Sequence, residues 1–155
     1  KLTLEKNTDY YPKDLLCFVC DEIGVETKKI SDPFINKNFY EKSLFPEIKL
    51  VLDKLSRKYN LGIFSEGFED YQSKKITLSG LIEYFDKKWI FIERRKLSPE
   101  ALAKIPVGST IIDDKKEVIG TLKNLRPDLD LAWINRKNEE KIEGIRTMKS
   151  LEELL

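Results

Sequence analysis

The stretch STIIDDKKEVI, residues 109–119, carries the pattern that decides the fold. The residues from Thr110 to Ile112 favour a β-strand, and two adjacent carboxylates, Asp113 and Asp114, follow at once. A helical pattern begins after two lysines. Neighbouring like charges at the end of an apolar run are costly unless a positive charge lies beside them. This stretch therefore predicts a buried strand, then a helix, with a cation at the junction.

The same alternation of strand and helix extends on both sides of this stretch. Short apolar runs predict strands, and segments with a 3.6-residue apolar period predict helices. Strands alternating with helices indicate an α/β fold, a Rossmann-like parallel sheet with helices on both faces. The predicted strands cover 61–65, 88–93, 109–113 and 130–134, and the predicted helices cover 13–23, 46–60, 71–85, 98–105 and 116–125, with a short strand-like piece and a helical turn in 145–155.

Composition narrows the function classes. The 155 residues suffice for one domain, and 28 basic against 27 acidic residues leave a net charge of +1. We therefore expect no nucleic-acid partner. No apolar run reaches the roughly 18–20 residues that span a bilayer, and the N-terminal residues are polar, so we expect no membrane partner and a cytoplasmic location.

The chain contains no histidine, which excludes Ser-His-Asp and Cys-His catalysis. Its two cysteines, Cys17 and Cys20, form a CxxC on a predicted apolar helix, and without further cysteines or histidines a zinc site is not expected. We interpret them as small buried hydrophobes in a reducing compartment. A metal site in this chain would use oxygen ligands, which points to Mg²⁺.

Polar residues follow the predicted strands where each strand ends. They are Ser65, the 93–96 stretch with Lys96, the pair Asp113 and Asp114, and the segment after Asn135. Ligands bind outside the carboxyl ends of such strands. The hydroxyl and the lysine predict phosphate binding, and the two carboxylates predict a bound Mg²⁺. Each residue also has a structural interpretation, because Asp favours turns and helix N-caps, and loop serines and surface lysines are common.

These motifs resemble those of the haloacid dehalogenase-like (HAD) superfamily, mainly Mg²⁺-dependent phosphatases. LGIFSEG is similar to its second motif, with Ser65 as the phosphate-binding hydroxyl, and RRKLSPEAL to its third, with Lys96 fitting best and Arg94 and Arg95 as competitors. STIIDDKKEVI resembles the fourth motif, which implies that Asp113 and Asp114 lie at the metal. The resemblance covers about residues 46 to 155.

The first motif of this superfamily, DxDx(T/V) at the end of the first strand, has no match in the chain. The one DxD, Asp128 to Asp130, precedes a predicted strand instead of ending one. The superfamily's first strand lies between its second and fourth, so a fold without it would leave two central strands unpaired on one side. We expect that strand and its nucleophilic aspartate upstream of Lys1.

The resemblance implies a single HAD-like domain over 1–155, with a small helical cap over 8–45 and an α/β core over 46–155. It implies a phosphatase that acts on a small phosphomonoester through an aspartyl-phosphate, as a monomer or weak dimer. Two alternatives stay open. One is a non-catalytic HAD-like binding domain or inactive fragment. The other is a receiver-like signalling domain, which is disfavoured because 93–96 is basic where an acidic phosphoacceptor is needed.

Overall fold

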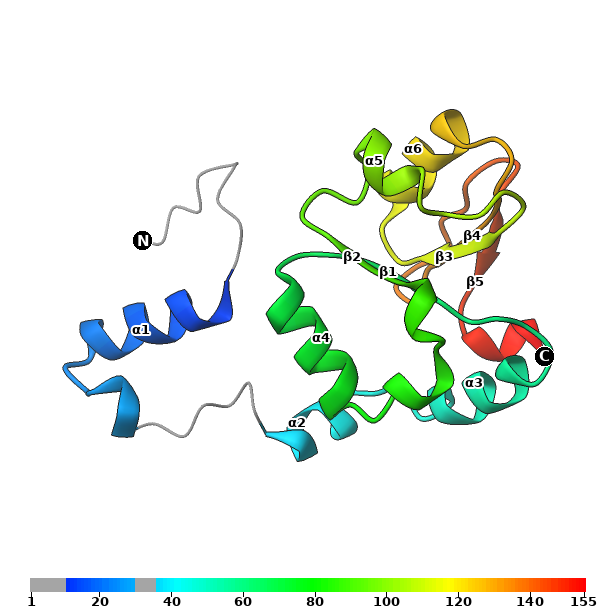
Figure 1. Cartoon of the computed structure of the whole chain (residues 1–155). Coiled ribbons are helices and arrows are strands. Elements are labelled where there is room, and N and C mark those ends of the chain that lie inside the picture. The colour runs from blue at the N-terminus through cyan, green and yellow to red at the C-terminus, as the bar shows by residue number, and fades with distance from the viewer. Residues whose placement is uncertain (1–10, 30–35) are drawn as a thin grey trace.

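The computed structural model describes residues 11–29 and 36–155 (Figure 1). It contains the four predicted strands and a fifth in the strand-like piece predicted within 145–155: β1 (Ile63–Glu66), β2 (Ile90–Glu93), β3 (Thr110–Asp113), β4 (Asp130–Ile134) and β5 (Arg146–Met148). Every paired strand runs parallel to its neighbour. The predicted parallel α/β architecture is confirmed.

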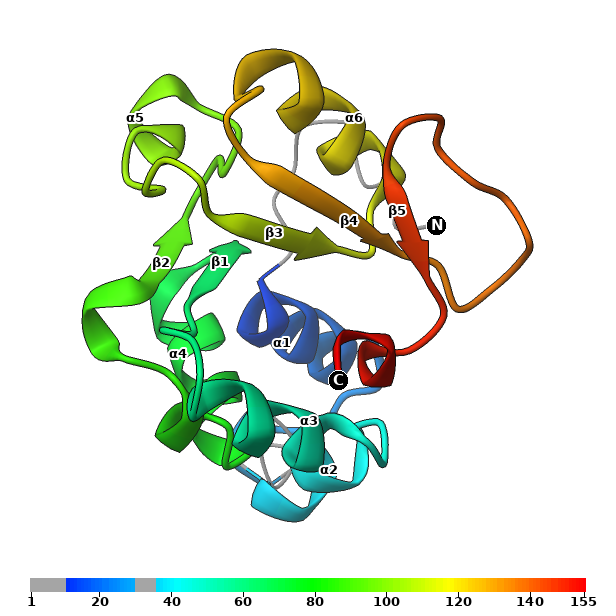
Figure 2. The same ribbon diagram turned by 90° about the vertical axis from the view of Figure 1, so that its right-hand side faces the viewer.

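The strands form two sheets instead of one. β1 pairs with β2 alone, and β3, β4 and β5 form a second sheet in that order. The facing strands β1 and β3 line the same cavity, yet no pairing joins them in the described structure (Figure 2). This is the unpaired arrangement that the sequence predicts for a fold without a strand between them.

Helices cover the second sheet on both faces. The helices α5 (Pro99–Leu102) and α6 (Lys116–Leu125) lie on one face, and α3 (Ile48–Ser56) and the 3₁₀ turn η5 (Leu151–Leu154) lie on the other (Figures 1 and 2). The helix α4 (Glu69–Leu78) follows β1, and the 3₁₀ turns η3 (Ile82–Tyr84) and η4 (Lys87–Trp89) lead into β2. Ser98 caps α5 by accepting a hydrogen bond from Ala101 N at 3.3 Å, as the sequence predicts.

The main core lies between α5, α6 and β4. Val118, Ile119 and Leu122 follow a helical period on α6, and all three side chains are buried. They pack with Leu131 and Trp133 of β4 in one cluster. Each such side chain stabilises the fold by about 1.5–3 kcal/mol through its burial, so this cluster fixes the position of β3 and β4 and of the carboxylates that follow β3.

The helix predicted over 71–85 is wrong in its C-terminal half. The helix α4 ends at Leu78, and Gly80 adopts a φ of +72°. Gly80 N donates to Thr77 O and Leu81 N donates to Ile76 O, which is a Schellman ending. The glycine in the predicted helix therefore terminates it, and the apolar residues after it form η3.

The N-terminal part is helical where it is described. It contains α1 (Pro12–Glu22), η1 (Thr27–Lys29) and α2 (Lys37–Lys42), while 8–10 and 30–35 of the predicted cap lie outside the described residues. Gly24, at φ +67°, follows α1 as predicted. The division into a cap and a core stays a prediction.

The interpretation of both cysteines as buried hydrophobes is wrong for one of them. Cys20 is fully buried, but Cys17 is exposed. Phe18 and Val19 beside it are 43% and 41% exposed, so α1 buries only a narrow stripe. No helix in the described residues is both long enough and apolar enough to cross a bilayer.

Candidate active site

The centre of the site is an ion pair between Lys96 and Asp113. Lys96, in the turn after β2, is 6% exposed. Its Nζ contacts Oδ2 of Asp113, the last residue of β3, and the two side chains are only 7% and 12% exposed. Buried charges are stable only when paired. The sequence predicts Mg²⁺ as the positive partner of the two carboxylates, whereas in the structure the cation beside Asp113 is Lys96.

Asp113 uses its other oxygen to shape the turn into α6. Its Oδ1 accepts a hydrogen bond from Lys115 N at 2.8 Å. Asp113 therefore stabilises a turn, which is the structural interpretation that the sequence offers for an aspartate here. The same carboxylate also pairs with Lys96. Asp114 is exposed, and its carbonyl accepts a hydrogen bond from Trp133 Nε1 at 3.0 Å. The backbone of Asp114 is thereby fixed while its carboxylate faces solvent.

A third carboxylate, Glu66, joins the site from β1. Its Oε2 accepts a hydrogen bond from the backbone N–H of Lys96 at 3.0 Å. The contact links residues 30 positions apart, which is why local sequence patterns did not single out Glu66. It fixes the turn that carries Lys96 against the carboxyl end of β1.

Ser65 lies next to Glu66 at the carboxyl end of β1 and is half-buried. After it, Gly67 adopts a φ of +145°, which favours glycine, and its N–H donates to Glu93 O at 2.9 Å. Ser65 thus lies at the carboxyl ends of the strands together with Lys96 and Asp113, and we call these residues and Glu66 the rim. The direct contact in the rim is between Lys96 and Asp113.

The two arginines that compete with Lys96 occupy other positions. Both are exposed, whereas Lys96 is buried. The Arg94 guanidinium lies 3.4 Å from the ring centroid of Phe68, and Arg95 Nη1 donates to Arg94 O at 2.9 Å. Of these three cations, Lys96 is the buried one, and its ammonium contacts Asp113 at the end of β3.

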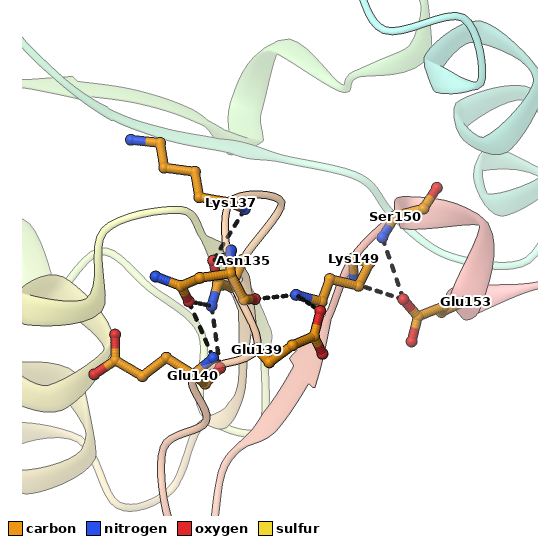
Figure 3. A network of polar contacts seen from close by, with 8 residues as sticks. Asn135, Lys137, Glu139, Glu140, Lys149, Ser150 and Glu153 are labelled. Carbon is orange, nitrogen blue, oxygen red and sulfur yellow. Dashed lines mark hydrogen bonds and ion pairs between the residues drawn. The ribbon is translucent and has the colours of Figure 1, made fainter.

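The segment after Asn135 forms a polar network at the ends of β4 and β5 (Figure 3). Asn135, 4% exposed, donates from Nδ2 to Asn138 Oδ1 at 2.6 Å and to Glu140 O at 3.0 Å, and its Oδ1 accepts from the N–H of Lys137. Lys149 Nζ pairs with Glu139 at 3.0 Å. These hydrogen bonds give the buried side-chain amide of Asn135 its partners and fix the loop that follows β4. The segment therefore has a structural role.

Across the described residues, 11–29 and 36–155, no three acidic or cysteine side chains cluster closely enough to hold a metal ion. Asp113 and Asp114 supply two carboxylates of the kind that Mg²⁺ prefers, but Mg²⁺ demands near-octahedral oxygen coordination. The donor set in these residues is therefore incomplete for this ion. The metal role of the two aspartates stays a prediction.

Comparisons with known proteins agree with the motifs. No protein-family model matches the chain. The chain is 26% identical over 152 residues to pyrimidine 5'-nucleotidase YjjG of Escherichia coli (strain K12), covering 86% of this chain and 65% of that protein. The fold is similar to YfnB from Bacillus subtilis, whose crystal structure is described as that of a HAD-type hydrolase bound to magnesium. The TM-score is 0.62 at 18% identity, over 96% of this chain and 84% of that one.

These comparisons confirm the resemblance to the HAD-like superfamily, and the fold is the α/β fold of that superfamily. The chain is similar in sequence to a nucleotidase and in fold to a HAD-type hydrolase. It spans 65% of the length of its curated relative, so the reaction, the substrate and the metal are matters of proposal.

Proposed function

We propose that the chain serves a HAD-type, Mg²⁺-dependent phosphatase that hydrolyses a small phosphomonoester. The observation that supports this function best is the buried Lys96 ammonium held by Asp113 at the carboxyl edge of the strands. A buried ammonium at a strand end suits a phosphate oxygen, because charge-assisted hydrogen bonds are strongest away from water. The similarity to a pyrimidine 5'-nucleotidase makes nucleotides a suitable class of phosphomonoester to test.

Each residue of the rim has a separate task in this proposal. Lys96 and the Ser65 hydroxyl donate hydrogen bonds to phosphate oxygens. Asp113 holds the ammonium in place, and Glu66 fixes the turn through the Lys96 N–H. When bound, Mg²⁺ neutralises phosphate charge, and it needs a ligand beyond Asp113 and Asp114.

The chain offers no evident nucleophile of its own. The DxD is engaged elsewhere: Asp128 pairs with Arg126 at 2.7 Å, and Asp130 Oδ2 accepts a hydrogen bond from Thr110 Oγ1 at 3.2 Å. Asp130 also begins β4 instead of ending it. The resemblance implies a nucleophilic aspartate on a strand upstream of Lys1. The lack of a DxD at any described strand end equally favours the second candidate, a non-catalytic HAD-like binding domain.

An activity assay separates the two candidates. With Mg²⁺ and either an aryl phosphate or a pyrimidine 5'-nucleotide, we expect no turnover by the 155-residue chain, because serine and lysine have no evident base to activate them. We expect turnover by an extended chain, which carries a strand ending in DxDx(T/V) ahead of Lys1. The matched control is the same extended chain with the first aspartate of that motif changed to asparagine.

Two substitutions in the extended chain test the roles of the rim. Asp113→Asn is expected to lower kcat/KM by about 100-fold or more, because Lys96 loses its partner and the metal loses a carboxylate. Lys96→Met is expected to cost about 10- to 100-fold, since one of several charges on the phosphate is lost. Turnover by the 155-residue chain that Asp113→Asn leaves unchanged would contradict the proposal.

A further inference from the structure

Two turns at the carboxyl ends of β1 and β2 carry the hydroxyl and the ammonium of the proposed phosphate site. Ser65 lies near the end of β1, and Lys96 lies three residues beyond the end of β2. The two strands are parallel neighbours in which Glu66 pairs with Glu93, so the turns start side by side. Two donors bind one phosphate group well only when their separation is fixed before the ligand arrives. The contacts between the two turns therefore decide how well the site is organised.

Hydrogen bonds join the turns at two points. Gly67 N donates to Glu93 O at 2.9 Å, and Lys96 N donates to Glu66 Oε2 at 3.0 Å. On the β1 side, Gln72 Nε2 donates to Glu66 O at 3.0 Å, and a Cβ on Gly67 would lie 2.7 Å from the same nitrogen. The turn after β1 is therefore closely packed. The part of the other turn that carries Lys96 reaches it through the exposed side chain of Glu66.

A stacked pair of side chains forms a third contact between the turns. The guanidinium carbon of Arg94 lies 3.4 Å from the ring centroid of Phe68, which places the cation against the face of the ring. Arg94 is two residues before Lys96. Tyr11 packs against the same ring with centroids 4.5 Å apart, and its hydroxyl donates to Asp70 Oδ2 at 2.5 Å. Residues outside both turns thus help to hold the ring in place.

Phe68 occupies a position where a small polar residue is usual. It is the N-cap of α4, and its side chain makes no capping hydrogen bond. Serine, threonine, aspartate and asparagine are favoured there, because a side-chain oxygen accepts a hydrogen bond from the first turn of the helix. Residues that break a local preference are expected at functional sites. The contact that accounts for this phenylalanine is its stack with Arg94.

We propose that Phe68 and Arg94 are positioning residues of the phosphate site. Their stack holds the turn after β2 against the turn after β1, and it thereby sets the place of the Lys96 ammonium relative to the Ser65 hydroxyl. The inference rests on the phosphate-binding role proposed for Ser65 and Lys96. It gives Arg94, a competitor of Lys96 in the sequence, a role other than that of a phosphate ligand.

The test uses the 155-residue chain, with inorganic phosphate as the probe and NMR detection at the amides of Ser65 and Lys96. Phe68→Leu removes the ring without a change of charge, and Arg94→Gln removes the guanidinium. Each is expected to weaken phosphate binding about two- to fivefold, the factor that corresponds to one exposed cation–π contact. The double variant should bind about as weakly as the weaker single variant, because both changes remove the same contact.

Three controls separate stacking from other effects. Arg95→Gln removes the same charge from the adjacent residue, whose Nη1 donates to Arg94 O, and is expected to weaken binding less than Arg94→Gln does. Phe68→Tyr keeps the ring and should restore the binding that Phe68→Leu loses. Lys96→Met removes the ammonium itself and should weaken binding most, which identifies the site that the phosphate occupies.

Amide hydrogen exchange measures the positioning without any ligand. The Lys96 N–H, which is bonded to Glu66 Oε2, should exchange faster in Phe68→Leu and in Arg94→Gln than in the parent chain. The N–H of Leu122, a fully buried residue of α6, should exchange at the parent rate in both variants. A general loss of stability would instead speed exchange at both amides.

Phosphate binding that requires Lys96 but is unchanged in both stack variants would overturn the inference and leave the phosphate role standing. So would losses that are equal in Arg94→Gln and Arg95→Gln and absent in Phe68→Leu, because charge alone would then explain them. A parent chain that binds no phosphate, or binds it as well as Lys96→Met does, would refute the phosphate role. Exchange of the Lys96 N–H would then decide the positioning: faster exchange in the stack variants supports it, and unchanged exchange overturns it.

Discussion

At the scale of single residues, burying the charges of Lys96 and Asp113 carries an energetic cost. Removing two charges from water costs free energy. The contact between the two charges and the hydrogen bond from Lys115 N to Asp113 offset that cost. An apolar pair would fill the same space without this cost. The phosphate-binding role proposed for Lys96 therefore accounts for this buried ion pair better than stability does.

The energetics of this pair can be tested by a double-mutant cycle on unfolding. Lys96→Met alone should destabilise the chain by about 3–4 kcal/mol, because Asp113 is left as an unpaired buried charge. The double variant Lys96→Met with Asp113→Leu should recover to within about 2 kcal/mol of the parent, since only the bond to Lys115 N is lost. Urea unfolding of the four proteins measures the coupling. Additive effects would show that the two charges do not interact.

A second charged residue, Glu47, joins distant parts of the chain. The hydrogen bond to its own backbone N–H and the Arg136 guanidinium lower the pKa of the Glu47 carboxyl. Arg136 Nη2 lies 2.5 Å from Glu47 Oε1, Ser150 Oγ donates to the same oxygen at 3.2 Å, and the carboxylate is 11% exposed. The residue before α3 is thus tied to the segment after β4 and to the cap of η5.

The lowered pKa of Glu47 predicts a pH dependence of stability. A carboxyl with a lowered folded-state pKa stabilises the fold above its unfolded pKa of about 4.3, and the contribution is lost as the pH falls through the folded value. Glu47→Gln should therefore destabilise the chain at pH 7 by about 1–2 kcal/mol and by progressively less below about pH 4. Unfolding curves from pH 7 to 3 measure this. A loss that is constant with pH would contradict the ionic role.

At the scale of elements, two glycines in helical patterns have opposite roles. Gly80 ends α4 at φ +72°, whereas Gly120 lies inside α6 with nothing within 4 Å of an added Cβ. Gly80→Ala should destabilise by about 1–2 kcal/mol because of its left-handed backbone, although the nearest atom to its Cβ, Lys49 Nζ, is 3.6 Å away.

The matched control is Gly120→Ala, which should stabilise the chain by about 0.5–1 kcal/mol through helix propensity. Thermal unfolding of both variants, with helix content from circular dichroism, checks the pair. If Gly80→Ala were stabilising, α4 would continue through position 80 and the sequence prediction of one helix over 71–85 would be restored.

The sequence predicted the elements better than it predicted their junctions. Strand positions followed from apolar runs, and the strand-end rule brought Lys96 and Asp113 into one site. Glu66 was missed because its importance comes from a contact 30 residues away. The end of α4 was missed although Gly80 carried the signal, since an isolated glycine in an apolar period can also lie inside a helix, as Gly120 does.

At the scale of the whole molecule, Lys96 links the two sheets through Glu66 of β1 and Asp113 of β3. Among the described strands, β1 pairs with β2, and β3 with β4 and β5 in that order, but no pairing joins β1 to β3. Unpaired strand edges are a liability that proteins usually cover or charge. The molecule is therefore expected to be least protected along the line that divides the two sheets.

This division predicts an alternating pattern of amide protection. In native-state hydrogen exchange followed by NMR, the N–H groups of Ile111 and Asp113, which face β4, should exchange slowly. Those of Thr110 and Ile112 face away from β4 and should exchange at least about tenfold faster, because strand neighbours differ in which side their N–H faces. The same contrast should hold in β1, with Glu66 faster than Ser65. Uniform protection along β3 would mean that its edge is already paired in solution, and the separation into two sheets would then be wrong.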